Sequence, residues 1–326
     1  MAFTYAPVKH TGKFASEIFS EVVEEATTAS KGLIRFFDNV KDEVNLTSMS
    51  GDVTFKKYKE DIREADYASY TDTLAASDKT LTPKKMQSIV FFKMDDLRQT
   101  RFVEGMAAGA GNIESTPFEA AVRAYLNPRY ARAFELKIWR GITVATKTAI
   151  AASGTATASQ KAWAAAQTPT ADDVVDGLIA QAILAGIGSQ TATSITTSNL
   201  KTEYEKVLSN LPTAVLGETD SCLFAPRSHK LLIDMFNTAQ TYRGDIFRVA
   251  GDQYSYLGKN IEFVPLPENT LVAGRSQEFG AATDLLADAV AFEIGKVNNV
   301  GDQMFGKLTV SLATDLVVPT QKILYI

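Results

Sequence analysis

The sequence has very few of the residues that bind transition metals or form disulfides. It contains one cysteine, Cys222, and two histidines, His10 and His229, in 326 residues. A single cysteine cannot form an internal disulfide, and the apolar residues around Cys222 predict a buried, inert thiol. No spacing of these residues resembles that of zinc ligands. A nucleophile paired with His229 would also need a third, orienting group, so we predict no catalytic, cofactor-binding or metal-binding residue.

The sequence also lacks long apolar runs and an excess of positive charge. No apolar stretch approaches the ~20 residues of a membrane-spanning helix, and the N-terminus lacks a basic-then-apolar secretory signal. We therefore expect a protein that is made and used in the cytoplasm, away from membranes. The 33 Lys and Arg against 38 Asp and Glu give a net charge of -5, which provides no general attraction to nucleic acid. The length and apolar content suffice for roughly two domains.

Residues 41–93 are charge-dense and strand-like, and they contain too little apolar surface to fold by themselves. In the stretch 52–60, Val53 and Phe55 share one face of an extended strand with two lysines. A two-stranded ribbon alone is only marginally stable in water, so we predict that it lies on a neighbouring subunit. Acidic residues nearby favour a protein contact of mixed charge over a surface that stacks nucleic-acid bases. The candidate inter-subunit contacts are Phe55, Lys57, Tyr58, Lys59, Arg63 and Glu64.

The clearest local signal is the segment Thr116-Pro117-Phe118-Glu119, which has the sequence of a helix capping box. It predicts a helix from 116 to about 153, which would be about 50 Å long at ~1.5 Å per residue. Pro128 is expected to kink or interrupt it. The charged face of this helix could be simply solvated, or it could meet acidic partners or lie near nucleic acid. Its cations are Arg123, Arg129, Arg132, Lys137 and Arg140.

The remaining pattern predicts a series of helices and strands. The stretch 86–94 is apolar on both faces, which is typical of a strand inside a sheet. The Ala-, Thr- and Ser-rich stretch 143–170 predicts a junction between two domains. The apolar residues 323–326 predict a closing strand in the sheet of the first domain. We also predict helices over 14–28, 172–184, 198–208 and 226–236, a strand over 221–224 and an edge strand over 256–267.

Several segments, taken in order, resemble those of one protein family. They are the loop end Leu81-Thr82-Pro83-Lys84-Lys85-Met86, the strand 89–92 with its helix 95–106, the long helix, Leu223-Phe224-Ala225-Pro226 before a helix, and Leu257-Gly258-Lys259-Asn260-Ile261. In this order the chain resembles the major capsid proteins of tailed double-stranded DNA bacteriophages, whose shell fold is shared with encapsulins. The resemblance implies an α+β fold with an N-terminal arm, an extended β-hairpin loop, a peripheral domain with a long spine helix, and an axial domain. The corresponding residues are 1–43 for the arm, 44–88 for the loop, 89–168 for the first part of the peripheral domain with its spine helix at about 116–153, 169–281 for the axial domain, and 282–326 for strands returning to the peripheral domain.

The resemblance further implies a structural function in the virion capsid. Copies of the chain would form pentamers and hexamers, assemble in the host cytoplasm into an icosahedral shell, and enclose double-stranded DNA without sequence-specific binding. No enzyme activity and no cofactor are implied. The implied partners are other copies of the chain, a portal and decoration proteins, with either a separate scaffolding protein or none.

Three other functions stay open at this point. An encapsulin-type compartment would share the fold but enclose a cargo protein. An enzyme that uses Asp and Glu side chains in the second domain is also compatible, because one fold can host unrelated functions. The Ala and Thr content fits a fibre or surface-layer protein as well, which would form open filaments rather than closed shells.

Overall fold

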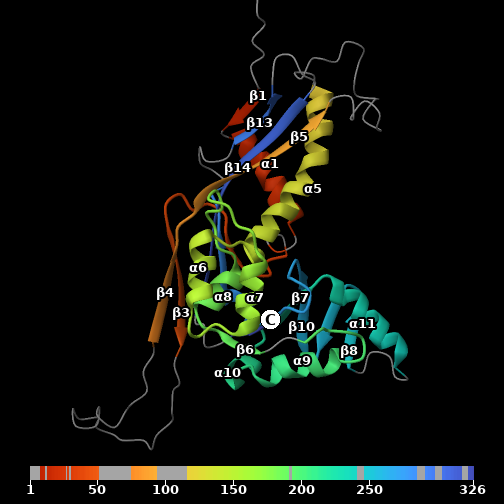
Figure 1. Cartoon of the computed structure of the whole chain (residues 1–326). Coiled ribbons are helices and arrows are strands. Elements are labelled where there is room, and N and C mark those ends of the chain that lie inside the picture. Colours follow the sequence, from red (N-terminus) through yellow and green to blue (C-terminus); the bar gives the residue numbers. More distant parts are fainter. Residues whose placement is uncertain are drawn as a thin grey trace, which may run out of the picture.

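The computed structural model describes residues 8–11, 13–26, 28, 31–50, 75–93, 116–190, 193–240, 246–284, 291–297, 303–317 and 322–326. It has a six-stranded sheet and a seven-stranded sheet, each with helices packed on it. A two-stranded hairpin extends away from both sheets (Figure 1). This mixture of helices with parallel and antiparallel strands confirms the predicted α+β class.

The six-stranded sheet is organised around one long strand, β14, which pairs antiparallel with three others. Leu308, Val310 and Leu312 share one face of β14 and are buried, as the alternating pattern predicts. The strands run in the order β1 (Val8–Thr11), β13 (Ala291–Lys296), β14 (Gln303–Leu316), β12 (Phe279–Ala282) and β2 (Arg35–Phe37), and β5 (Lys84–Lys93) also pairs with β14.

Two helices, α1 (Lys13–Glu25) and α5 (Thr116–Arg140), pack against each other and against this sheet. α1 confirms the predicted amphipathic helix, since Phe19 and Val22 are fully buried. The ring of Phe19 meets that of Phe134 on α5 edge to face, with centroids 5.4 Å apart. This arrangement is favourable for aromatic pairs and fixes α1 beside α5.

The predicted single long helix is divided in the structure. α5 ends before Gly141, and a separate helix, α6 (Val144–Ala152), follows. At the break Gly141 crosses Gly177, whose amide donates to the Gly141 carbonyl at 2.8 Å. A Cβ at Gly141 would lie 2.7 Å from the Lys137 carbonyl oxygen, so the crossing requires glycine. Pro128, which is expected to kink or interrupt the helix, does not interrupt it, because it lies inside α5.

The side chain of Asp176 caps the helix that follows this break. Its carboxylate accepts hydrogen bonds from the Thr143 amide at 2.7 Å and from Thr146 Oγ1 at 2.8 Å. Thr143 Oγ1 in turn accepts from the Thr146 amide at 3.2 Å, which satisfies an amide that a helix start leaves unpaired. The helix predicted over 172–184 is also shorter, because the residues around Asp176 serve this crossing. In the structure it is α8 (Leu178–Leu184).

The seven-stranded sheet carries a second core. The predicted helices near 198–208 and 226–236 and the strand near 221–224 are confirmed, with small shifts at their ends. The helices on this sheet are α9 (Leu200–Ser209), α10 (Thr213–Leu216) and α11 (Ser228–Ala239). The strands run in the order β6 (Gly188–Gln190), β15 (Ile323–Tyr325), β11 (Leu271–Arg275), β7 (Ser221–Pro226), β10 (Lys259–Val264), β9 (Gln253–Tyr256) and β8 (Phe247–Ala250).

Two strand predictions are wrong. β10 is not an edge strand, because it pairs with β7 on one side and β9 on the other. β15 does not return to the six-stranded sheet; it lies between β11 and β6 in the seven-stranded sheet. An apolar C-terminal strand could complete either sheet, so its composition predicts burial without giving its position.

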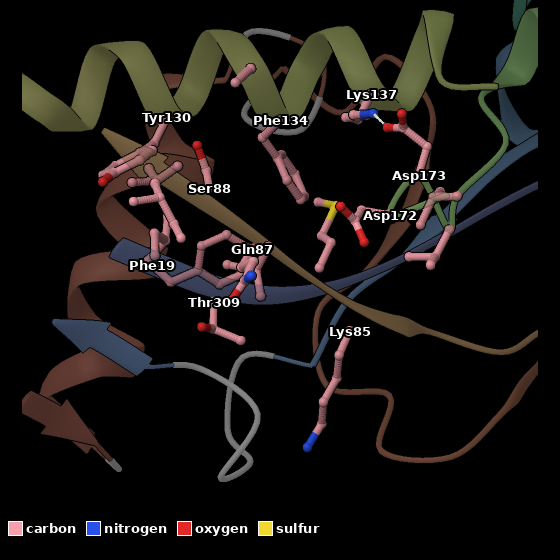
Figure 2. A pocket seen from close by; sticks show the side chains of 18 of the residues that line it. Phe19, Lys85, Gln87, Ser88, Tyr130, Phe134, Lys137, Asp172, Asp173 and Thr309 are labelled. Atoms are coloured by element: carbon pink, nitrogen blue, oxygen red, sulfur yellow. Dashed lines mark hydrogen bonds and ion pairs between the residues drawn. The ribbon is translucent and has the colours of Figure 1, made fainter. Parts of the chain in front are cut away.

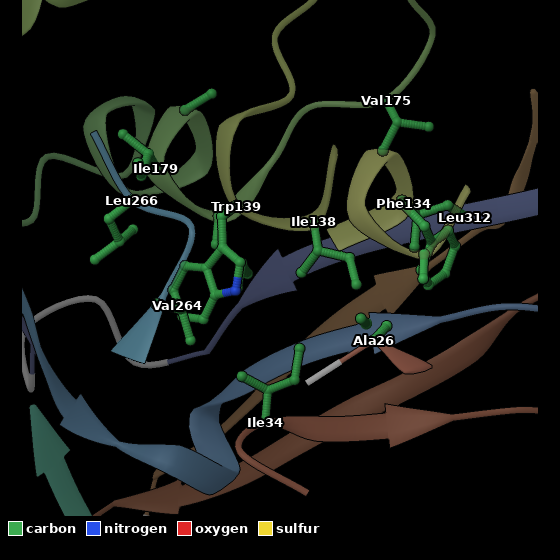
Figure 3. Close-up of a cluster of buried hydrophobic side chains, with 14 of the residues drawn as sticks. Ala26, Ile34, Phe134, Ile138, Trp139, Val175, Ile179, Val264, Leu266 and Leu312 are labelled. Atoms are coloured by element: carbon green, nitrogen blue, oxygen red, sulfur yellow. The ribbon is translucent and has the colours of Figure 1, made fainter. Parts of the chain in front are cut away.

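The six-stranded sheet with its helices and the seven-stranded sheet with its helices form two units, and these meet at a cluster of aromatic rings at the end of α5. The Trp139 ring lies 4.9 Å from that of Phe224 on β7 and 6.4 Å from that of Phe279 on β12. Figure 3 shows Trp139 among Val264, Ile179 and neighbouring apolar side chains. The helix α8 packs in the core that also contains the six-stranded sheet, which is the first core. The helix α6 packs against both α8 and α7 (Ala158–Ala166). The seven-stranded sheet is therefore buried on both faces near its centre.

Candidate assembly surfaces

The strand β5 presents an open edge. It pairs with β14 along its whole length, and no other described strand pairs with it. Its side chains alternate between exposed and partly buried, and those of Ile89 and Phe91 are 42% and 57% exposed. The prediction that this strand is buried on both faces is therefore wrong for the chain by itself. A long edge strand with exposed apolar side chains is a template for pairing with another chain.

A groove of about 570 Å³ lies between β5 and α5. Figure 2 shows Tyr130 and Phe134 pointing from α5 toward β5, while Lys85 points away from the helix. The lining is mostly apolar, and one end carries the ion pair between Lys137 and Asp173. Partial burial alone would raise the pKa of Asp173, but hydrogen bonds from Lys137 and Thr170 lower it overall. The groove thus offers an apolar floor with a fixed charge pair at one end.

The sequence contains a signal for this open edge that the apolar pattern obscured. Lys84 and Lys85 begin β5 and Lys93 ends it. Charged residues at strand ends, lysine above all, are typical of exposed edges. Tyr130 closes the inner side of the groove, where its hydroxyl donates to the Gly306 carbonyl of β14 at 2.9 Å.

The hairpin of β3 (Val44–Ser50) and β4 (Ala75–Leu81) extends beyond the six-stranded sheet (Figure 1). Its base is anchored, since Leu46 and Leu81 are each 1% exposed. A Cβ at Gly280 of β12 would lie 2.5 Å from Leu46 Cδ2, so the hairpin sits directly on β12. The six predicted contacts, Phe55, Lys57, Tyr58, Lys59, Arg63 and Glu64, lie outside the described residues.

The cations of α5 fall into two groups. Two of them have acidic partners: Arg123 Nε lies 3.8 Å from Glu21, and Lys137 pairs with Asp173. The others, Arg129, Arg132 and Arg140, follow the outward side of the helix at spacings of three and eight residues. Among the described residues none of these three forms an ion pair.

Arg129 is held in place by its own helix. Its guanidinium lies 3.5 Å from the centre of the Tyr125 ring and donates to the Tyr125 carbonyl at 2.7 Å. Arg129 and Arg132 are exposed, and Arg140 is half-buried. A planar, permanently charged guanidinium is well suited to phosphate, so this side of α5 is the strongest candidate for contact with a polyanion.

The histidine considered as part of a nucleophilic pair lies in the interior. His229 is 2% exposed, and its Nδ1 lies 3.1 Å from the Tyr204 hydroxyl inside the second core. Cys222, predicted to be buried, is only partly buried, and this burial raises the pKa of its thiol, which makes the thiol less reactive. In the described ranges no three His, Cys, Asp or Glu side chains gather to hold a metal ion. None of the described helices is long and apolar enough to cross a membrane.

Comparison with solved structures identifies the fold. No family model matches the sequence, and no curated protein matches it. The structure is similar to the procapsid of satellite phage P4, which includes the size determination (Sid) protein, at a TM-score of 0.55 and 10% identity over 95% of this chain and 97% of that chain. It is also similar to the capsid of a native GTA particle, at a TM-score of 0.51 and 8% identity over 92% and 89% of the two chains. The chain has the major capsid protein fold of tailed phages.

A third capsid-fold neighbour, from Mycobacterium phage Adephagia, matches at a TM-score of 0.50 and 13% identity over 98% of this chain and 91% of that chain. These matches extend over nearly the whole capsid fold. The resemblance drawn from the order of segments is therefore confirmed at the level of the fold.

Proposed function

We propose that this protein is the structural subunit of a phage capsid. Copies assemble as pentamers and hexamers into a closed icosahedral shell that encloses double-stranded DNA, within the virion and after assembly in the host cytoplasm. The observation that carries the proposal is the open edge of β5, where Ile89 and Phe91 stay exposed on a chain with the capsid fold. Other copies of the chain are the proposed partners of this edge.

The geometry favours head-to-tail contacts between copies. The hairpin of β3 and β4 and the open edge of β5 are different surfaces of one subunit. Contacts between two different surfaces generate rings where the rotation closes. We assign the predicted hairpin contacts, such as Lys57 and Arg63, to the donor side and the edge and groove of β5 to the acceptor side.

The outward arginines of α5 mark the side of the subunit that would face the enclosed DNA. Arg129, Arg132 and Arg140 would contact phosphates without reading base sequence, because they offer charge and no fixed base-edge geometry. The net charge of -5 keeps the rest of the surface from holding the DNA tightly. A separate scaffolding protein, a portal and decoration proteins complete the proposed set of partners.

Negative-stain microscopy of the purified chain tests the proposal. The wild type should form closed particles, and the double variant Ile89→Asp with Phe91→Asp should not. Because both side chains are exposed, the free energy of unfolding of the dispersed variant should change by less than about 1 kcal/mol.

Val144→Asp is the matched control, since Val144 is 47% exposed and begins α6, where an acidic residue is favourable. This variant should still form particles. Assembly by the double variant would refute the role of β5. Particles from the native source that enclose protein instead of DNA would favour a cargo compartment.

A further inference from the structure

Glu135 on α5 is a buried carboxylate that bonds to two distant parts of the chain. It is 2% exposed. Its Oε1 accepts from the amide of Thr28 at 3.2 Å and from the Thr28 hydroxyl at 2.8 Å. Its Oε2 accepts from Arg227 Nη2 at 2.5 Å. Thr28 follows α1, and Arg227 lies between β7 and α11, so both cores meet at one charge.

Trp139 completes this cluster. Its indole Nε1 donates to Thr28 Oγ1 at 3.0 Å, and its ring packs on Phe224 of β7. The Thr28 hydroxyl therefore donates to Glu135 and accepts from Trp139, which fixes its orientation. Thr28, three residues after the end of α1, is therefore bonded to the turn of α5 that packs on the seven-stranded sheet.

The two charged partners differ in their access to water. The Arg227 side chain is 47% exposed, whereas that of Glu135 is 2% exposed. If the β7–α11 connection shifts, the guanidinium can be solvated while the carboxylate stays buried without its counter-charge. An unpaired buried charge is strongly unfavourable. Movement of Glu135 toward water would relieve this cost, but it would break the hydrogen bonds that Glu135 accepts from Thr28.

We propose that Glu135 couples the packing of the seven-stranded unit against α5 to the packing of α1 against α5. A contact that shifts the β7–α11 connection loosens α1, and release of Thr28 loosens Arg227 in return, because coupling between two sites is reciprocal. The device goes beyond the shell function: it links an N-terminal helix to a surface in the other half of the chain. It acts within a single copy.

Hydrogen exchange on the dispersed full-length chain tests the coupling. Arg227→Met should raise the exchange rates of the α1 amides at least tenfold relative to those of β14, which report opening of the whole sheet. Lys230→Met is the control: Lys230 lies in the first turn of α11, three residues after Arg227, and pairs with Asp252 at 3.3 Å. It should leave α1 unchanged. Equal exchange of α1 in the two variants would overturn the proposal.

A charge-free background separates coupling from general damage. Glu135→Gln keeps an acceptor for Thr28 but removes the charge, so adding Arg227→Met to it should have little further effect on α1. Thr28→Val should raise exchange of the hydrogen-bonded amides inside α11, beyond its first turn, as reciprocity requires. If Thr28→Val affects α1 alone, the proposal fails. These measurements need no particles, so their outcome is independent of whether the chain forms shells.

Discussion

Replacing Gly177 by alanine should destabilise the chain by obstructing the crossing that ends α5. The added Cβ would lie 2.6 Å from the Gly141 nitrogen, 2.8 Å from the Lys137 carbonyl oxygen and 2.8 Å from the Trp139 carbonyl carbon. All three atoms belong to the backbone and cannot rotate away. Overpacking of this kind costs about 1–3 kcal/mol, and a weakened bond from Gly177 to the Gly141 carbonyl adds about 1 kcal/mol.

The replacement also lowers the conformational entropy of the unfolded chain, which stabilises the folded state by about 0.4–1 kcal/mol. The net loss should be about 1–3.5 kcal/mol, measured as the free energy of unfolding in urea at constant m. Gly154→Ala is the control, because no atom lies within 4 Å of its added Cβ. That variant should be neutral or slightly stabilised. Equal stability of the two variants would refute the close approach of Gly141 and Gly177.

Two further predictions concern charge. Burial lowers the pKa of His229 from 6.5 to about 4, so its contribution to stability is complete above pH 6.5 and is lost as the pH falls toward 4. The free energy of unfolding in urea should fall by about 3 kcal/mol over this pH range. His229→Gln should remove that part of the pH dependence. Identical pH profiles of wild type and variant would contradict the prediction. Replacing Arg129, Arg132 and Arg140 by glutamine should reduce the salt dependence of binding to short duplex DNA by a slope of about 2–3. Arg123→Gln, which removes a cation already paired with Glu21, should change it less, and an unchanged slope in the triple variant would argue against a DNA-facing α5.

Features set by neighbours in sequence could be predicted well. The helical spacing of Phe19 and Val22 predicts α1, and both side chains are buried. The segment from Thr116 to Glu119 correctly predicts where α5 begins. The cations on α5 could be named from the sequence, but the structure was needed to separate Arg123, which faces Glu21 of another helix, from those on the outward side.

Features set by distant contacts could not be predicted. Nothing near residue 141 in the sequence reveals that Gly177 crosses there, so the local pattern predicts too long a helix. The exposure of Ile89 and Phe91 was missed for a different reason. An apolar strand reads the same whether its second face is covered by its own chain or by another copy, and the pattern predicts burial in both cases.

The last strand shows what specifies a position when the apolar pattern does not. Leu324 would fit beneath either sheet, but Tyr325 has a hydroxyl that must be satisfied when buried. It donates to Glu203 of α9 and accepts from the Thr193 amide at 2.9 Å. Those partners lie beside the seven-stranded sheet, just as Asp176 finds the Thr143 amide at the start of α6 and Glu135 finds Arg227 beside β7. Apolar spacing in this chain determines which residues are buried, and the paired polar atoms determine the neighbours against which they are buried.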